Sequence, residues 1–203
     1  LSGALSLPLI KPLRARRLRM PAAGVRARAR RVFVAGGVLA YPTESCFGLG
    51  CDPRQPAALA RVLALKQRVR AKGLILIAAE LQQLLPFIQA PAADDLRRFA
   101  EYWPGPFTLL LPASRKVHPW LRGRHNKIAV RITNHPQAAG LCRALGSALV
   151  STSANRSGKI SLKTAAACRT AFGSRAYTVP GTIGLARKPS TIVDYANGKI
   201  LRA

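Results

Sequence analysis

The sequence predicts a single α/β domain built on a twisted sheet, because short apolar runs alternate with segments of helical periodicity along most of the chain. Its 203 residues suit one domain with a sizeable core. Hydrophobic residues make up 49% of the chain. No segment approaches the roughly 20 unbroken apolar residues that a membrane helix needs. We therefore expect a soluble, globular protein that does not span a membrane.

The expected elements follow in order from residue 37. Two short apolar runs are typical of buried strands, GVLAYP (37–42) and GLILIAA (73–79), and between them AALARVLALKQR (57–68) has helical spacing. Together they predict a β–α–β unit. Further strands are expected at 107–112, 127–132, 148–152 and 176–179, and helices near 93–102, 136–145 and 163–171. The segment TIVDYANGKILR predicts a hairpin that turns at Asn197-Gly198 and gives the sheet an antiparallel edge.

The charge balance is extreme, with 33 lysines and arginines, seven acids and a formal net charge of +26. Such a field attracts phosphates on a nucleotide, on RNA or on an anionic membrane surface, although a generally basic proteome would give the same balance. The scarce carboxylates leave little material for a paired general acid and base or for an all-protein Mg²⁺ site. We expect any Mg²⁺ to be held mainly by substrate phosphates.

The cysteines and histidines lie at spacings that match no zinc or redox motif. They are Cys46, Cys51, Cys142, Cys168, His118, His125 and His135. We expect reduced, mostly buried thiols in a cytoplasmic protein, structural or surface roles for the histidines, and no protein metal site.

Residues 1–31 carry nine basic residues and no acid. A secretory signal is disfavoured, because the apolar run precedes the positive charge and is broken by a proline, whereas an organellar transit peptide stays open. A third interpretation starts the natural product at Met20, the only methionine, and takes residues 1–19 as upstream sequence. We expect a basic N-terminal appendage at 1–24 and the main domain at 25–203.

The common nucleotide motifs are absent, since there is no P-loop and no complete dinucleotide fingerprint. Three polar segments nevertheless lie at the ends of expected strands or helices. YPTES (41–45) displays a hydroxyl and a carboxylate where α/β sheets place ligands, although an ordinary capped turn explains it equally well. KQRVRAKG (66–73) places four cations close enough to favour a bound anion, unless it is a solvated basic helix end. STSANRSG (151–158) suits a nucleotide or an amino acid, or is a polar turn.

Together these segments resemble the YrdC or Sua5 family of threonylcarbamoyl-AMP synthases, in its short bacterial form. The signatures, in order, are YPTE, a KxR motif with a following lysine, WPGPFT (103–108), AVR (129–131), STSANRSG and PSTIVD (189–194). The resemblance covers roughly residues 25–202. It implies an open, twisted, mixed β-sheet flanked by helices, with a basic concave face, and a catalytic domain at 25–203.

The resemblance also implies a reaction. Family members condense ATP, L-threonine and bicarbonate into threonylcarbamoyl-AMP and pyrophosphate, with ATP as a substrate. A carbamate formed on the amino group of threonine attacks the α-phosphorus of ATP. Proteins of the t6A transferase complex then pass the threonylcarbamoyl group to adenosine 37 of tRNAs that read codons beginning with A.

Carried over by position, the resemblance assigns two groups of residues. The expected catalytic and ATP-binding residues are Lys66, Arg68, Ser153 and Asn155, with Lys72 adding charge for the triphosphate. The expected threonine-binding residues are Thr43, Arg131, Ser151 and Ser190. Val69 and Ala71 stand where the family usually has a proline and an acid, which leaves the aim of Arg68 and Arg70 open.

Two other functions stay open at this point. A protein that binds tRNA or other RNA through the basic face, without catalysis, would use the charge but would not need the YPTE and STSAN segments. An ATP-dependent module that handles carbamoyl groups for another acceptor would share the KxR and SxN motifs without preferring threonine.

Overall fold

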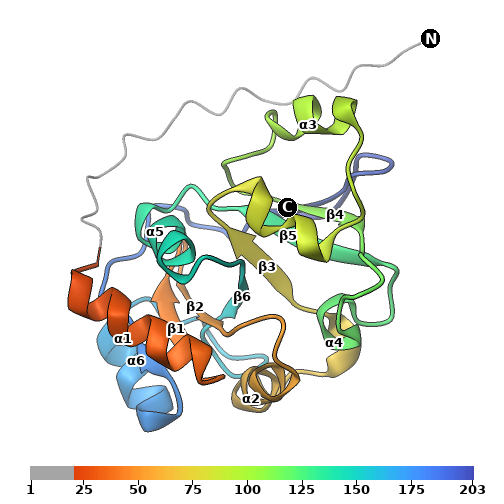
Figure 1. The fold of residues 1–203 in the computed structure, drawn as a ribbon. Coiled ribbons are helices and arrows are strands. Elements are labelled where there is room, and N and C mark those ends of the chain that lie inside the picture. Colours follow the sequence, from red (N-terminus) through yellow and green to blue (C-terminus); the bar gives the residue numbers. More distant parts are fainter. Residues whose placement is uncertain (1–20) are drawn as a thin grey trace.

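The computed structural model describes residues 21–203 (Figure 1), so the expected appendage at 1–24 lies mostly outside the described residues. Within this range the centre of the molecule is one nine-stranded sheet in the order β7-β1-β2-β6-β3-β5-β4-β8-β9. The strands are β1 (Leu39–Pro42), β2 (Phe47–Gly50), β3 (Ile75–Ala78), β4 (Phe107–Pro112), β5 (Lys127–Ile132), β6 (Leu149–Ser153), β7 (Tyr177–Thr178), β8 (Thr191–Asp194) and β9 (Lys199–Arg202). Three of the pairs, β1 with β7, β3 with β5 and β4 with β8, are parallel and the others antiparallel. The expected mixed sheet is confirmed.

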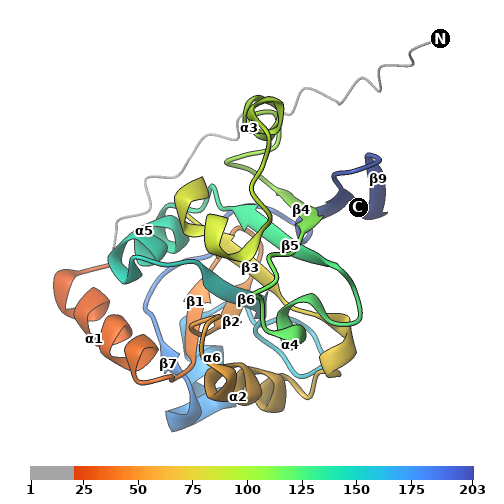
Figure 2. The same cartoon turned by 45° about the vertical axis from the view of Figure 1, so that its right-hand side comes forward.

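Helices cover both faces of one half of this sheet. They are α1 (Ala23–Val34), α2 (Pro56–Lys66), α3 (Ala93–Phe99), α4 (Pro119–Arg122), α5 (Pro136–Leu145) and α6 (Ala165–Phe172). One apolar core joins α1 and α5 to β1, and the other joins α2 and α6 to the opposite face. Figures 1 and 2 show α1, α2 and α6 gathered at one end of the molecule and α3 at the other. No helix among the described residues is long and apolar enough to cross a membrane.

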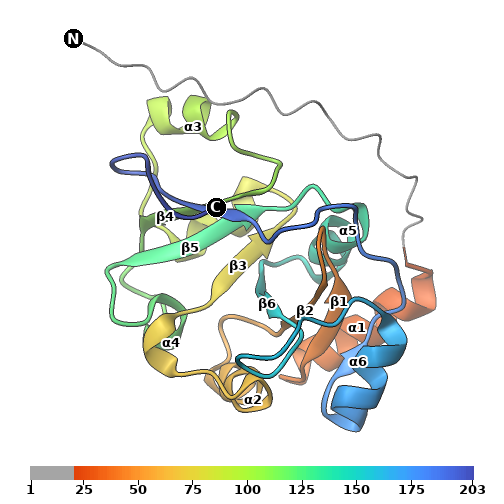
Figure 3. The same ribbon diagram turned by 180° about the vertical axis from the view of Figure 1, so that it is seen from behind.

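The C-terminal hairpin is the antiparallel edge that the sequence predicted. Strand β8 pairs in parallel with β4, and β9 folds back on β8 through a turn at Gly198, whose φ is +70°. Seen from behind in Figure 3, this hairpin lies beside β4 and β5. The hairpin therefore places residues near the C-terminus in the same sheet as β3 and β5.

The structure differs from the expectation in one pairing and in three elements that the sequence analysis does not predict, β2, α1 and α4. The β–α–β unit is interrupted, because β2 pairs antiparallel with β1, and both β2 and β6 lie between β1 and β3. The sequence FGLG of β2 was not read as a strand, yet the close approach of β6 requires its glycine: a Cβ on Gly50 would collide with the Val150 carbonyl oxygen. Helix α1 is not predicted because only Ala29 and Phe33 of its arginine-rich sequence are buried, and α4 because it has four residues of which only Leu121 is buried.

Candidate functional site

The last residue of α2 ties the KxR motif to the SxN motif. Lys66 is only 4% exposed, and its Nζ donates to Ser153 Oγ at 3.0 Å and to Asn155 Oδ1 at 2.8 Å. The same ammonium also donates to the main-chain carbonyl oxygens of Ser153, at 2.8 Å, and of Asn155, at 3.3 Å. Ser153 Oγ in turn donates to Asn155 Oδ1 at 2.7 Å. Three of the five residues expected to bind ATP thus form one hydrogen-bonded cluster.

The ionisation of Lys66 is sensitive to its surroundings. Burial, followed by the positive charge of Arg68, lowers the pKa of Lys66 to about 8. Near neutral pH most molecules therefore carry a charged Lys66, and a small fraction carry it in the neutral form. An anion placed beside Lys66 would favour its charged form and raise this pKa again.

Arg68 lies in the loop that follows α2 and is held by main-chain oxygens. Its Nε donates to the Gly73 carbonyl at 3.0 Å and its Nη2 to the Lys72 carbonyl at 3.4 Å, while burial lowers the pKa of Arg68. Val69 has φ −64° and ψ 128°, which a proline would also adopt. The departure at Val69 therefore leaves the loop with proline-compatible geometry.

Arg131 in β5 is paired within the chain by an acid that the site prediction did not include. Its Nη2 donates to Glu44 Oε2 at 2.9 Å, while Thr133 Oγ1 and the Asn134 amide donate to Glu44 Oε1 at 2.7 and 3.1 Å. Burial alone would raise the pKa of Glu44, but the Arg131 charge and the Thr133 hydroxyl outweigh burial and hold the pKa below its usual value. Among residues 21–203, the buried Nε of Arg131 has no hydrogen-bond partner.

The two hydroxyls expected in the threonine pocket are both buried. Thr43 Oγ1 donates to the Cys46 carbonyl at 2.7 Å, which fixes the turn after β1 and leaves the hydroxyl oxygen able to accept a hydrogen bond. Ser151 lies opposite Ile75 in the pairing of β6 with β3. Strand β3 in turn pairs with β5, where Ala129 lies opposite Ile75. Arg131 is two residues further along β5.

Ser190 is part of a second cluster. Its partner in this cluster is Arg202, which the sequence analysis does not assign to the site. Ser190 Oγ lies 2.7 Å from Thr108 Oγ1, and Arg202 Nη2 donates to the Ser190 carbonyl at 2.7 Å and to its Oγ at 3.2 Å. Burial, and then the charges of Arg131 and Arg68, lower the pKa of Arg202. Only the hairpin pairing could have brought Arg202 to the site, because it lies far from the KxR motif in sequence.

A cleft of about 430 Å³ lies on the sheet face that the helices leave open, and three of the cations described above line it, Arg68, Lys72 and Arg202. Its floor follows one row of paired residues across the sheet, from Ile75 in β3 through Ala129 and Leu110 to Asp194 in β8. Its rim includes Arg68, Lys72, Lys127 and Arg202. Asp194, the acid in the lining, is already paired with Lys127 Nζ at 2.6 Å. A small apolar floor with a cationic rim suits a ligand that combines a flat ring with phosphates.

Comparison with known proteins identifies the family. Residues 31–203 match the model of the Sua5_yciO_yrdC family, whose description reads "Telomere recombination". The chain belongs to this family. It is 56% identical over 184 residues to the threonylcarbamoyl-AMP synthase of Chromobacterium violaceum, which covers 91% of this chain and 95% of that protein. It is 54% identical over 180 residues to the enzyme of the same name from Thiobacillus denitrificans, with 89% and 94% covered.

Solved structures agree with this assignment. The crystal structure of P. abyssi Sua5 complexed with L-threonine superposes with a TM-score of 0.76 at 28% identity, over 87% of this chain and 52% of that one. This chain therefore spans about half the length of P. abyssi Sua5. E. coli YciO superposes with a TM-score of 0.78 at 23% identity, over 91% of each chain, and supports the fold. The resemblance drawn from the sequence is confirmed.

Proposed function

We propose that this chain is an L-threonylcarbamoyladenylate synthase. It converts ATP, L-threonine and bicarbonate into threonylcarbamoyl-AMP and pyrophosphate, for the t6A modification at position 37 of tRNAs that read ANN codons. The observation that carries the proposal is the Lys66, Ser153 and Asn155 cluster at the end of α2, in a chain whose curated relatives at 56% and 54% identity are named for this activity.

The cations around the cleft bind the triphosphate of ATP. Lys66, Arg68 and Lys72 come from one helix end and the loop after it, so they approach the phosphates from a single side. Ser153 and Asn155 accept hydrogen bonds from the Lys66 ammonium and so fix its positive charge close to that of Arg68. Arg202 adds a guanidinium from the opposite edge, and its closeness to Arg68 indicates that both can reach one polyanion.

Threonine binds beside Arg131, which Glu44 orients. Because Glu44 occupies Nη2, a substrate carboxylate would pair with the other terminal nitrogen of the guanidinium. Thr43 and Ser151 supply hydroxyls for the remaining polar groups of the amino acid. The L-threonine complex of P. abyssi Sua5 supports an amino-acid pocket in this fold.

The chemistry needs positioning and neutralised charge more than a strong protein base. The threonine amine and bicarbonate give a carbamate and water. A carbamate oxygen then forms a bond to the α-phosphorus of ATP, and the bond from that phosphorus to the bridging oxygen breaks as pyrophosphate leaves. Lys66, Arg68 and Lys72 stabilise the negative charge that grows on the leaving group.

The Mg²⁺ that accompanies ATP would be held mainly by the phosphates. Residues 21–203 contain no group of three or more histidines, cysteines, aspartates or glutamates placed to hold a metal ion. An ion brought in with ATP would reduce the charge on the phosphates, while the cations of the cleft hold their outer oxygens.

Partners and location are further parts of the proposal. The net charge of +26 supports contact with tRNA or other RNA, and the product's onward use requires the proteins of the t6A transferase complex. Four free thiols support a reducing compartment, the cytoplasm. A binder of RNA without catalysis is the competing function, and the same charge favours it.

The test is trapping of the labile adenylate. Purified protein is incubated with ATP, L-threonine and bicarbonate, and threonylcarbamoyl-AMP is detected by mass spectrometry beside AMP and pyrophosphate. Omission of threonine or of bicarbonate should abolish the product. Pyrophosphate release that ignores both omissions, or RNA binding without any adenylate, would overturn the proposal.

A further inference from the structure

A second pocket lies beside α2. It has a volume of about 530 Å³, and α2, α6 and the segment that leads into β1 form its walls. Its floor is apolar and includes Val38, Leu65 and Phe172. None of its lining residues borders the cleft described above, so the two hollows are separate. Its volume is within the range of small-molecule sites.

Three arginines come together at this pocket, and its lining contains no acid. They are Arg61 from α2, Arg156 from the SxN loop and Arg175 from the turn after α6. Arg61 Nη1 donates to the Gly36 carbonyl, and Arg175 donates through Nε and Nη2 to the Phe172 and Ala171 carbonyls at 3.3 and 3.1 Å. These bonds fix two guanidinium groups while leaving other N–H groups of each unused.

Arg156 has no hydrogen bond or ion pair from its side chain within residues 21–203. The three arginines are exposed, and no acid in the lining neutralises their charge. An anion that bridges them would neutralise it. The combination of a cationic rim and an apolar floor selects an anion that also carries an apolar or aromatic body.

We propose that this pocket binds a nucleotide, with its phosphate on the three arginines and its base over the apolar floor. Arginine side chains pair with phosphates through two parallel hydrogen bonds and also stack on bases, so they serve both parts of such a ligand. The nucleotide is either free or one unit of an RNA strand. This site is additional to the ATP site of the proposed synthase and does not depend on that function.

The pocket shares two segments with the Lys66 cluster. Gln67, which lines the pocket, follows Lys66 directly, and Arg156 follows Asn155. Asn155 Nδ2 donates to the Arg156 carbonyl at 3.0 Å and also to the Lys159 carbonyl, so the SxN loop is tied together around Arg156. A ligand on Arg156 would therefore steady the loop that holds Lys66.

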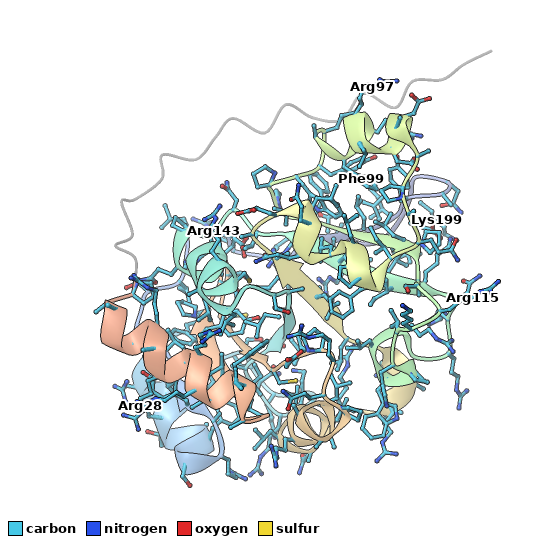
Figure 4. The ribbon with its side chains drawn as sticks, in the orientation of Figure 1. Arg28, Arg97, Phe99, Arg115, Arg143 and Lys199 are labelled. Atoms are coloured by element: carbon cyan, nitrogen blue, oxygen red, sulfur yellow. The ribbon has the colours of Figure 1, made fainter. Side chains whose placement is uncertain are left out.

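The experiment follows backbone amide NMR signals during titration, because these report each hollow separately. Gly37 and Gln67 report the pocket, and Ala129 reports the cleft. Two probes are titrated at one fixed salt concentration, AMP and a short single-stranded RNA. The variants are Arg156→Gln and a charge-matched control, Arg115→Gln, whose exposed side chain projects at the far side of the molecule (Figure 4).

We expect saturable shifts of the Gly37 and Gln67 signals, and about 10- to 100-fold weaker binding at these signals in Arg156→Gln. The control should stay within about twofold of the natural chain, which accounts for general charge. Shifts with AMP identify a free nucleotide as sufficient, and shifts with RNA alone identify a nucleotide within a strand. The proposal fails if neither probe shifts these signals, or if both variants bind both probes equally.

Discussion

Two regions of the proposed site, the end of α2 with the loop after it and Arg131 in β5, carry similar cations in opposite electrostatic settings. At the end of α2, Lys66, Arg68 and Lys72 stand together, and the hydrogen-bond acceptors of Lys66 and Arg68 are neutral oxygens. In β5, Arg131 is buried against the carboxylate of Glu44. Uncompensated cations suit a polyanion such as a triphosphate, whereas a neutralised guanidinium recognises one carboxylate through the geometry of its remaining N–H groups. For the proposed synthase, this difference would direct ATP to the end of α2 and the amino acid to Arg131.

The largest effect should appear in the choice of amino acid at Arg131. Valine has the size of threonine but lacks its hydroxyl, so it would lose the hydrogen bonds that the pocket makes to that hydroxyl and should be rejected by up to about 10⁴-fold. Serine lacks only a methyl group and should be weaker than threonine by about 10- to 200-fold. AMP formation with the three amino acids at equal concentration measures this order. Equal rates with valine and threonine would contradict the pocket.

The next effect concerns the buried pair itself. Glu44→Ala should lower the free energy of unfolding by about 3–5 kcal/mol, because it leaves the Arg131 charge buried without its partner. Glu80→Ala is the matched control, since its pair with Arg143 is more than half exposed and should contribute about 0–1 kcal/mol. Urea denaturation of both variants measures the difference. Equal losses would show that Glu44 does not compensate a buried charge.

At the α2 end, charge should matter for activity and little for stability. Arg68→Ala should reduce AMP formation by about 10- to 150-fold, the value of one charge-assisted hydrogen bond to phosphate, while the melting temperature changes little. Arg115→Ala removes an exposed arginine elsewhere and should leave activity unchanged. Near-normal turnover in a folded Arg68 variant would remove this residue from the ATP site.

The smallest effect tests the loop between these cations. Val69 already has φ −64°, so Val69→Pro should keep activity and raise the free energy of unfolding by about 0.4–1 kcal/mol through a less flexible unfolded chain. Denaturation curves and AMP formation check the two halves of this prediction. A loss of both would show that the loop needs a backbone N–H or a freedom that proline removes.

Much of the fold could be predicted because its helices and longer strands carry local signals. Strands β4 and β5 and helix α5 have the expected bounds, and α5 stops at Gly146, whose φ of +66° ends the helix. Strand β2 and helix α1 were missed, because their burial depends on contacts with β6 and the sheet rather than on local periodicity.

The site divides in the same way. The order of the motifs predicts that Lys66, Ser153 and Asn155 belong to one site, and hydrogen bonds join them in the structure. The role of Glu44 depends on its contact with Arg131, which is 87 residues away in the sequence. The role of Arg202 depends on the pairing of β9 with β8 in the final hairpin. No local pattern in the sequence encodes such contacts.

The most direct test of the contrast between the two regions is the salt dependence of binding. Dissociation constants for ATP and for threonine are measured by calorimetry from about 50 mM to about 300 mM salt, a range over which the screening length falls by more than half. Binding of ATP to uncompensated cations should weaken severalfold, and binding of threonine beside the Glu44 and Arg131 pair should stay within about twofold. Equal salt dependence for the two ligands would contradict the account.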